Sequence, residues 1–483
     1  MEHAARGGHL SVLEWLHLNC AEFTCPGKRK YEREKARSIQ EILRHVHATQ
    51  ICTRARHWGY DTSKVCTGPS QAIDFAALGG HLNVVEWLHF NREDICTHQA
   101  MDNASEIGHL SIVEFLHTNR SEGCTTSAMD NAAEHGHLFL MEWLHENRTE
   151  GTQFAMERAA ANGHLSVLEW LHDHGYHDQD GLIWWIDSAA ENGHLEVVRW
   201  LHVNGYGERD NDYGAGCCTT EAMNRAAEKN YLPMVEWLHA YRGEGCTRKA
   251  LDRAAENGHL GMVEWLHANR SQDIWDVDGD WAEETTETMD AAAASGELAV
   301  VKWLHVNRPD EGCTCNAMDH SAGNGHLAAV EWLHTNRSEG CTTDAMDQAA
   351  ADGYLSVVEW LHVHRSEGCS TGAMNLAARY GHLSVVKWLH AHRSEGCTRV
   401  AINGAARDGH LAVVEWLFTH GFYSNEDPIF EAATTGQLNV VQWLCEQVPI
   451  CDGNKKIFKS AMWAAAKNGR TKVVDCLHQK VSV

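Results

Sequence analysis

The most regular feature of the chain is an apolar pattern that returns about every 28 residues. The copy at residues 341–368 reads CTTDAMDQAAADGYLSVVEWLHVHRSEG, and Thr342 stands where a helix would need its N-cap. The first apolar positions have the spacing of one helix face: Ala345, Met346, Ala349 and Ala350. A wider apolar stripe follows at Leu355, Val357, Val358, Trp360 and Leu361. The pattern therefore predicts two short helices in each copy, which we name helix A and helix B.

A glycine separates the two predicted helices. Aligning the chain on the segment GHLSVVKWLH, residues 381–390, gives fifteen copies, in which this position is Gly fourteen times and Asn230 once. Gly and Asn enter the left-handed backbone conformation more readily than other residues, and many helices end in that conformation. We therefore predict a structural, left-handed residue at the end of each helix A, for example Gly136, Gly258 and Gly381.

Tryptophan marks helix B, because thirteen of the nineteen Trp residues occupy one position in it. Five of them are predicted to be structural: Trp143, Trp265, Trp332, Trp360 and Trp388. The Ala pairs of helix A leave room for close approach, and Trp and Leu would fill the space between copies. One unit of this size cannot bury its apolar stripe alone, so the units must stack. The expected fold is an all-α solenoid of about 15 helix-turn-helix repeats.

The string AAENGHLEVVRWLH, residues 189–202, resembles the ankyrin repeat, and the resemblance covers residues 1–20 and most of 66–483. The period near 28 is shorter than the usual period of about 33, and T-x-x-A-M-D replaces the TPLH tetrapeptide of the family. The missing residues fall in the connection NRSEGC, residues 336–341, where family members carry a β-hairpin finger. The resemblance implies a stack whose helices A line a concave face, with shortened or absent fingers.

Breaks in the regular spacing divide the chain. We expect a truncated first repeat, a basic insertion or degenerate repeat, three blocks of repeats separated by a flexible and an acidic insertion, and a divergent C-terminal cap. In chain order these segments are residues 1–20, 21–65, 66–204, 205–216, 217–272, 273–284, 285–422 and 423–483. From residue 21 to residue 64 there are ten basic and five acidic residues. This segment is either a solvated insertion or a docking or nuclear-import patch around Lys28, Arg29 and Lys30.

The charge of the chain argues against one class of partner. Forty Lys and Arg face 66 Asp and Glu, a formal net charge of -26, which is opposite to the balance of a protein that grips phosphates. No run of 18 apolar residues is present. We therefore expect no nucleic-acid binding and no membrane contact, and a monomeric protein in the cytoplasm, with the nucleus as the alternative.

Cysteine and histidine also follow the repeat. Cys341, Cys369 and Cys397 are each 28 residues apart. Equivalent positions on stacked helices lie roughly 10 Å apart, too far for a disulfide, so we predict reduced, buried thiols. Of the 35 His residues, 23 occupy two repeat positions, which indicates a structural role such as hydrogen bonding to a loop carbonyl. We expect no catalytic residue, no metal and no cofactor. One irregular cluster consists of His172, His174, His177 and Asp178.

An acidic residue usually follows the Met of helix A. Seven of these residues are candidates for partner binding: Asp74, Asp102, Asp130, Asp252, Asp290, Asp319 and Asp347. They form either a carboxylate ladder on the helix A face or a set of capping or solubilising groups. The first interpretation predicts a non-enzymatic scaffold or adaptor that binds a partner protein with a basic segment on this face. The alternative is an enzyme, or a metal-dependent or pH-responsive sensor, that uses the His-rich positions.

Overall fold

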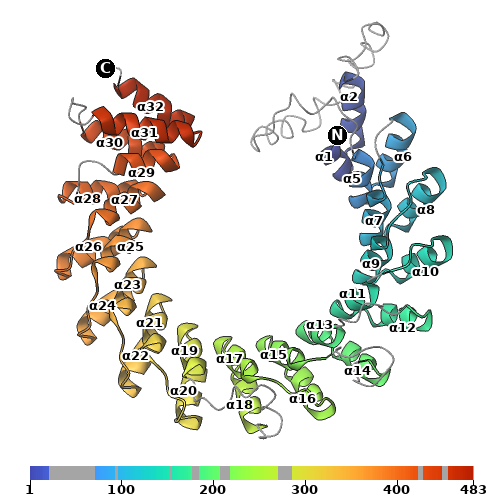
Figure 1. Cartoon of the computed structure of the whole chain (residues 1–483), viewed down its shortest axis with the longest axis horizontal. Helices are drawn as coiled ribbons and strands as arrows, with labels where there is room; N and C mark the ends of the chain where they lie inside the picture. Colours follow the sequence, from blue (N-terminus) through green and yellow to red (C-terminus); the bar gives the residue numbers. More distant parts are fainter. Residues whose placement is uncertain are drawn as a thin grey trace. The chain divides into compact units, whose positions relative to one another are not determined.

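The repeating apolar pattern folds into helices throughout the described part of the chain. The computed structural model describes residues 1–20, 71–92, 96–152, 154–176, 184–206, 218–269, 286–422, 428–448 and 455–481. These residues form thirty helices and no strand (Figure 1). The all-α prediction is therefore confirmed, and so is the absence of β-hairpin fingers from the described connections. The predicted insertions at 21–65 and 273–284 lie outside the described residues, as do residues 207–217.

The first of two compact units contains Met1–Ala226 and Pro233–Glu244. Its helices A are α1 (Glu2–Arg6), α5 (Ala72–Leu78), α7 (Gln99–Glu106), α9 (Ser127–Glu134), α11 (Ala155–Ala161), α13 (Trp185–Glu191) and most of α15 (Thr220–Glu228). Its helices B are α2 (Leu10–Cys20), α6 (Leu82–Asn91), α8 (Leu110–Asn119), α10 (Leu138–Asn147), α12 (Leu165–Asp173), α14 (Leu195–Val203) and most of α16 (Leu232–Tyr241).

The second unit contains Ala227–Leu232 and Gly245–Val483. Its helices A are α17 (Arg248–Glu256), α19 (Glu287–Ala294), α21 (Cys315–Gly323), α23 (Thr343–Ala351), α25 (Thr371–Arg379), α27 (Arg399–Asp408), α29 (Pro428–Thr435) and α31 (Lys455–Lys467). Its helices B are α18 (Leu260–Ala268), α20 (Leu298–Asn307), α22 (Leu327–Asn336), α24 (Leu355–His364), α26 (Leu383–His392), α28 (Leu411–Thr419), α30 (Leu438–Gln447) and α32 (Thr471–Val481).

Within each unit the helices A form one row and the helices B form a second row (Figure 1). Neighbouring helices A pack closely against one another, whereas neighbouring helices B meet at fewer points. The predicted Ala pairs explain this difference, because Ala349, Ala350 and Ala377 are fully buried in the A row and add little bulk between helices. Val357, Val358 and Leu361 of helix B are also buried, so the core lies between the two rows.

The turn from helix A to helix B has the predicted left-handed residue. The φ angles are 74° at Gly136, 74° at Gly258 and 87° at Gly381, and Asn230 adopts 62°. The His that follows each of these glycines reaches back to the preceding repeat. His164 Nε2 lies 3.0 Å from the carbonyl oxygen of Glu134, the structural role that the sequence indicates. Burial lowers the pKa of the equivalent residues His137 and His194, because it disfavours the charged imidazole.

Replacing Gly381 by Ala is expected to destabilise the protein more than the same change at Gly421. Both residues are left-handed, with φ of 87° and 80°, which costs a residue with a Cβ about 1–2 kcal/mol. A Cβ on Gly381 would also lie 2.5 Å from Nδ1 of His410, whereas nothing lies within 4 Å of one on Gly421. Urea unfolding should show the larger loss for Gly381→Ala. Equal losses would contradict the close packing of the His410 ring.

Candidate functional site

The aspartates that the sequence marks as partner-binding candidates lie inside the stack. Six of them are at most 9% exposed: Asp74, Asp102, Asp130, Asp290, Asp319 and Asp347. Asp252 is partly buried, accepts a hydrogen bond from the Thr288 hydroxyl and lies 3.6 Å from Nε of Arg248. The predicted surface position of these carboxylates is therefore corrected: burial keeps six of them from the reach of a partner.

These carboxylates hold the start of the next repeat. Thr342 donates its backbone N–H to Oδ1 of Asp319 and its hydroxyl to Oδ2, both at 2.8 Å. The Thr342 hydroxyl oxygen in turn accepts the backbone N–H of Asp344 at 3.1 Å, which confirms Thr342 as an N-cap. The same carboxylate contact joins Asp74 to Thr97, Asp102 to Thr125, Asp187 to Thr219, Asp290 to Thr314 and Asp347 to Ser370. The capping role, which the sequence left open, describes these contacts.

Burial and hydrogen bonding act in opposite directions on these carboxylates. Burial raises the pKa of Asp319 above its ordinary value, because it disfavours the charged form, and the two hydrogen bonds from Thr342 partly offset this. The pKa values of Asp74, Asp102 and Asp187 are raised for the same reason. These carboxylates therefore join neighbouring repeats, but the loss of water around their charge offsets part of the stability that the hydrogen bonds provide.

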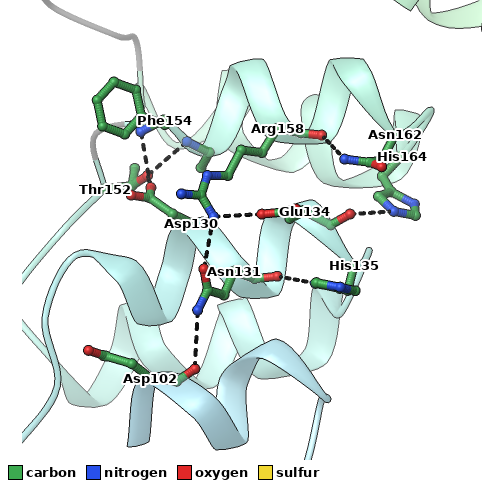
Figure 2. A network of polar contacts seen from close by, with 11 residues as sticks. Asp102, Asp130, Asn131, Glu134, His135, Thr152, Phe154, Arg158, Asn162 and His164 are labelled. Carbon is green, nitrogen blue, oxygen red and sulfur yellow. Dashed lines mark hydrogen bonds and ion pairs between the residues drawn. The ribbon is translucent and has the colours of Figure 1, made fainter. Parts of the chain in front are cut away.

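The accessible surface of the A row begins one residue later, at the position that varies between repeats. In the first unit this position links neighbouring repeats (Figure 2). Arg158 donates to Oδ1 of Asn131 at 2.8 Å and pairs with Glu134 at 2.6 Å. Asn131 in turn donates to the carbonyl oxygen of Asp102 at 3.4 Å. Here the variable position connects α7, α9 and α11.

The same position is largely uncharged from α21 to α27 of the second unit. It carries His320, Gln348, Leu376 and Gly404. The side chains of His320 and Gln348 are exposed, whereas Leu376 and Gly404 are half-buried. Two apolar side chains nearby are also accessible: Tyr380 is 48% exposed and Val400 is 54% exposed. Arg379 lies beside the Tyr380 ring, 5.5 Å from its centre, and pairs with Asp408 at 3.3 Å. This surface of α21, α23, α25 and α27, which we name the A face, is the candidate binding site.

Helix B uses its Trp to contact the repeat before it. The His334 ring meets the edge of Trp360 with centroids 5.3 Å apart, and Nδ1 of His334 accepts a hydrogen bond from Arg365 at 3.2 Å. The same ring contact joins His117 to Trp143, His305 to Trp332 and His362 to Trp388. These Trp residues and Trp265 are half-buried, so they bridge repeats at the edge of the stack and are not enclosed in it.

The connections between repeats are tight turns that contain an ion pair. Arg365 pairs with Glu367, and its guanidinium also contacts the thiol of Cys341 in the preceding connection. The Arg–Glu pair recurs at Arg120–Glu122, Arg148–Glu150, Arg242–Glu244, Arg337–Glu339 and Arg393–Glu395. Burial raises the pKa of Cys341 to about 11. Cys341, Cys369 and Cys397 form no disulfide in this structure; Cys341 and Cys369 are buried and Cys397 is half-buried.

Acid is expected to weaken these ion pairs. The hydrogen bond from Arg393 lowers the pKa of Glu395 below its ordinary 4.5. Because the folded-state pKa is the lower one, the contribution is complete above pH 4.5 and is lost as the pH falls through the folded value. Glu395→Gln should cost about 0.5–1 kcal/mol at pH 7. Urea unfolding should show that this difference from the unmodified protein shrinks as the pH falls below 4.5, and a constant difference would contradict the pairing.

A cavity of about 240 Å³ lies in the first unit, where the connection at residues 147–154 lacks the usual Cys. Its lining includes Cys124, Arg148 and Tyr176. Arg148 pairs with Glu150, and the Tyr176 hydroxyl lies 2.7 Å from Nδ1 of His145. The cavity is smaller than most ligand sites, which measure about 300–1,000 Å³, and these polar groups have partners within the protein.

The two described residues of the irregular histidine cluster, His172 and His174, contact side chains of the repeats. His172 lies 2.7 Å from the Tyr206 hydroxyl, and the His174 ring stacks on Trp170 with centroids 4.2 Å apart. His177 and Asp178 lie outside the described residues. Within the described ranges, no three His, Cys, Asp or Glu side chains are arranged to hold a metal ion.

Two family models match this architecture. A model of ankyrin repeats in three copies matches residues 186–278, 346–426, 374–457 and 402–482, and a model of ankyrin repeats in many copies matches residues 129–172 and 289–334. The chain belongs to the ankyrin-repeat family. A search of the curated proteins finds no match. In several described connections of these short ankyrin repeats, an Arg–Glu ion pair lies in a tight turn. No helix in the described part of this ankyrin-repeat chain has the length and hydrophobicity needed to cross a bilayer.

The outward face of the ankyrin B row carries acidic residues that are accessible to a partner. The Glu before the Trp position is exposed in α8, α12, α16, α18, α22 and α24. Phe90 and Phe139 are also exposed on helices B of the first unit. The signal was present in the chain, since Glu precedes the Trp position in ten of the fifteen repeats. These residues form the accessible acidic surface that the buried aspartates do not provide.

Proposed function

We propose that this protein is a non-enzymatic scaffold or adaptor that binds a partner protein on the A face. Ankyrin repeats are in general protein–protein interaction modules. The observation that supports this use here is a division of labour between positions. The Asp, Gly, His, Trp and Arg positions join one repeat to the next, whereas the position after Asp changes between repeats and stays accessible at His320 and Gln348.

The chemistry of the A face suits a protein partner. Leu376, Tyr380 and Val400 offer apolar area, while His320 and Gln348 offer hydrogen-bonding groups. Aromatic side chains surrounded by polar groups commonly carry much of the free energy of protein association. A rigid row of helices also presents these groups without the entropy cost of ordering a loop.

Arginine substitutions on the A face test this function. Gln348→Arg with Leu376→Arg should abolish capture of the partner, because two long charged side chains would cover the surface. The fold should tolerate them, since Arg158, Arg225 and Arg253 occupy the same position in other repeats. The matched control is Ser356→Arg with Ser384→Arg, on the B row of the same two repeats.

The measurement is affinity capture with the full chain, followed by mass spectrometry. We expect at least one protein that is captured by the unmodified chain and by the control, and is lost with the A-face variant. If both variants capture the same proteins as the unmodified chain, the A face is not the binding site.

A further inference from the structure

Four helices of the B row in the first unit form one continuous surface. Helices α6, α8, α10 and α12 belong to consecutive repeats and lie side by side (Figure 1). An edge-on ring contact joins each of these four helices to the next. Where the same contact occurs elsewhere in the described B row, the ring centroids lie 5.1–5.5 Å apart. Here the pairs are His89–Phe115 at 5.5 Å, His117–Trp143 at 5.2 Å and His145–Trp170 at 5.4 Å.

Two phenylalanines project from this surface. Phe139 on α10 is 81% exposed and Phe90 on α6 is 71% exposed. The Phe90 ring centre lies 6.3 Å from that of Phe115 on α8, so aromatic area extends across neighbouring repeats. Exposed apolar groups of this kind are unfavourable in water and mark interaction surfaces when polar groups surround them. The face is therefore an unpartnered helix face with aromatic anchors.

The charge of the face is of one sign. Helices α6, α8, α10 and α12 contain no Lys or Arg, and they contain six carboxylates: Glu86, Glu114, Glu142, Glu146, Glu169 and Asp173. Arg120 and Arg148, which follow α8 and α10, are already paired with Glu122 and Glu150. The carboxylates of the helices therefore have no basic residue on their own helices to neutralise them.

The second unit lacks this uninterrupted charge. Lys302 of α20 and Lys387 of α26 replace Glu at the same position of helix B. The helices between and beside them keep Glu264, Glu331 and Glu359, so the charge alternates. The acidic run of the first unit is thus not a necessary result of the repeat, and Lys at this position is compatible with the fold.

We propose that Glu86, Glu114, Glu142 and Glu169, with Phe90 and Phe139, form a second docking surface, which we name the acidic B face. Its occupant is a basic amphipathic helix of a partner protein, whose apolar side chains cover the two Phe rings and whose Lys or Arg side chains meet the carboxylates. Charge complementarity selects this occupant and excludes acidic segments. The spacing also fits, because neighbouring helices lie roughly 10 Å apart and residues seven apart on a helix are separated by about 10.5 Å. This surface goes beyond the A face and rests on the scaffold function only in that its partner is a protein.

The experiment uses the full chain and a fluorescent 21-residue peptide that repeats Leu-Lys-Lys-Leu-Leu-Lys-Leu three times. A peptide of the same composition in scrambled order, which has no apolar stripe, is the peptide control. Glu86→Lys with Glu114→Lys, Glu142→Lys and Glu169→Lys should weaken binding at least about tenfold, because each contact then becomes repulsive. Phe90→Ser with Phe139→Ser should weaken binding about tenfold at unchanged charge.

The matched control places the same four charge reversals on the second unit, at Glu264, Glu331, Glu359 and Glu415. Its net charge changes by the same amount, and its affinity for the peptide should stay within about twofold of the unmodified chain. Equal weakening by both sets of reversals would show attraction by net charge alone and would overturn the proposal. Unchanged binding by the Phe variant, or equal binding of the scrambled peptide, would also overturn it. The variant Gln348→Arg with Leu376→Arg should bind the peptide normally, so failure of the A face and failure of the acidic B face are distinguishable.

Discussion

Replacing Asp347 by Ala is expected to lower the free energy of unfolding by about 2–3 kcal/mol. Asp347 is 7% exposed and accepts the backbone N–H of Ser370 at 2.8 Å, and also its hydroxyl. Removing the carboxylate leaves these two donors without their acceptor at the start of α25. The Ser370 hydroxyl oxygen accepts the N–H of Gly372 at 2.9 Å, so the N-cap itself loses its support. Urea unfolding monitored by Trp fluorescence should measure the loss, as a shift of the unfolding midpoint to lower urea concentration.

The matched variant Asp347→Asn should lose much less. The chain itself contains Asn375 at this position, and its Oδ1 accepts the backbone N–H of Thr398 at 2.9 Å and the hydroxyl at 3.3 Å. One amide oxygen can therefore replace most of the carboxylate contact. Hydrogen exchange should place the loss in Asp347→Ala at the α23–α25 junction, because repeats interact mainly with their neighbours. Equal stability of the Ala and Asn variants would contradict the capping role.

Local features of the fold could be predicted from the sequence because they depend on backbone preferences. Asn230 replaces Gly at one copy of the turn, and this substitution alone indicates a left-handed residue, which the φ of 62° confirms. Thr342 could be recognised as an N-cap from its place before an apolar period. The stacking of repeats followed from the size of the apolar stripe, which one helix pair cannot bury.

The accessible acidic surface could not be predicted in the same way, because two acidic positions recur in each repeat. Asp347 and Glu359 have similar charge, and hydropathy predicts that both face water. Asp347 can be buried because Ser370 of the next repeat, 23 residues further along the chain, donates a hydrogen bond to its carboxylate. Glu359 has no such constraint and is exposed. A buried carboxylate is thus explained by a contact between repeats, which the pattern within one repeat does not contain.

The position of the Trp rings has a similar cause. Trp360 was expected to fill the space between repeats, and it does contact His334 of the preceding one. It is nevertheless half-buried, because the neighbouring helices B meet at fewer points than the helices A. The small Ala residues of the A row and the large rings of the B row together set this difference in spacing.

Replacing Ala377 by Leu is expected to lower the free energy of unfolding by about 3 kcal/mol, the upper end of the usual cost of overpacking. Ala377 is fully buried in α25, in the row where neighbouring helices pack most closely. The equivalent residue of α21 is Ser321, whose hydroxyl donates to the carbonyl oxygen of Ala293 in α19 at 2.7 Å. Backbone of the neighbouring helix is therefore within hydrogen-bond distance of this side chain. A Leu side chain at residue 377 would have to displace that backbone. Backbone cannot move aside as easily as the end of a flexible side chain.

The matched variant is Ala377→Ser, which reproduces the residue found naturally at Ser321. Its hydroxyl would be buried but could donate to a carbonyl of the neighbouring helix or of its own preceding turn, as Ser321 does to Ala293 and Ala317. We therefore expect a loss below about 1 kcal/mol for Ser. Urea unfolding of both variants measures the difference, and comparable stability of Leu and Ser would mean that the A row can open without cost. Such an outcome would also remove the physical reason for the Ala pair that most repeats carry at these two positions.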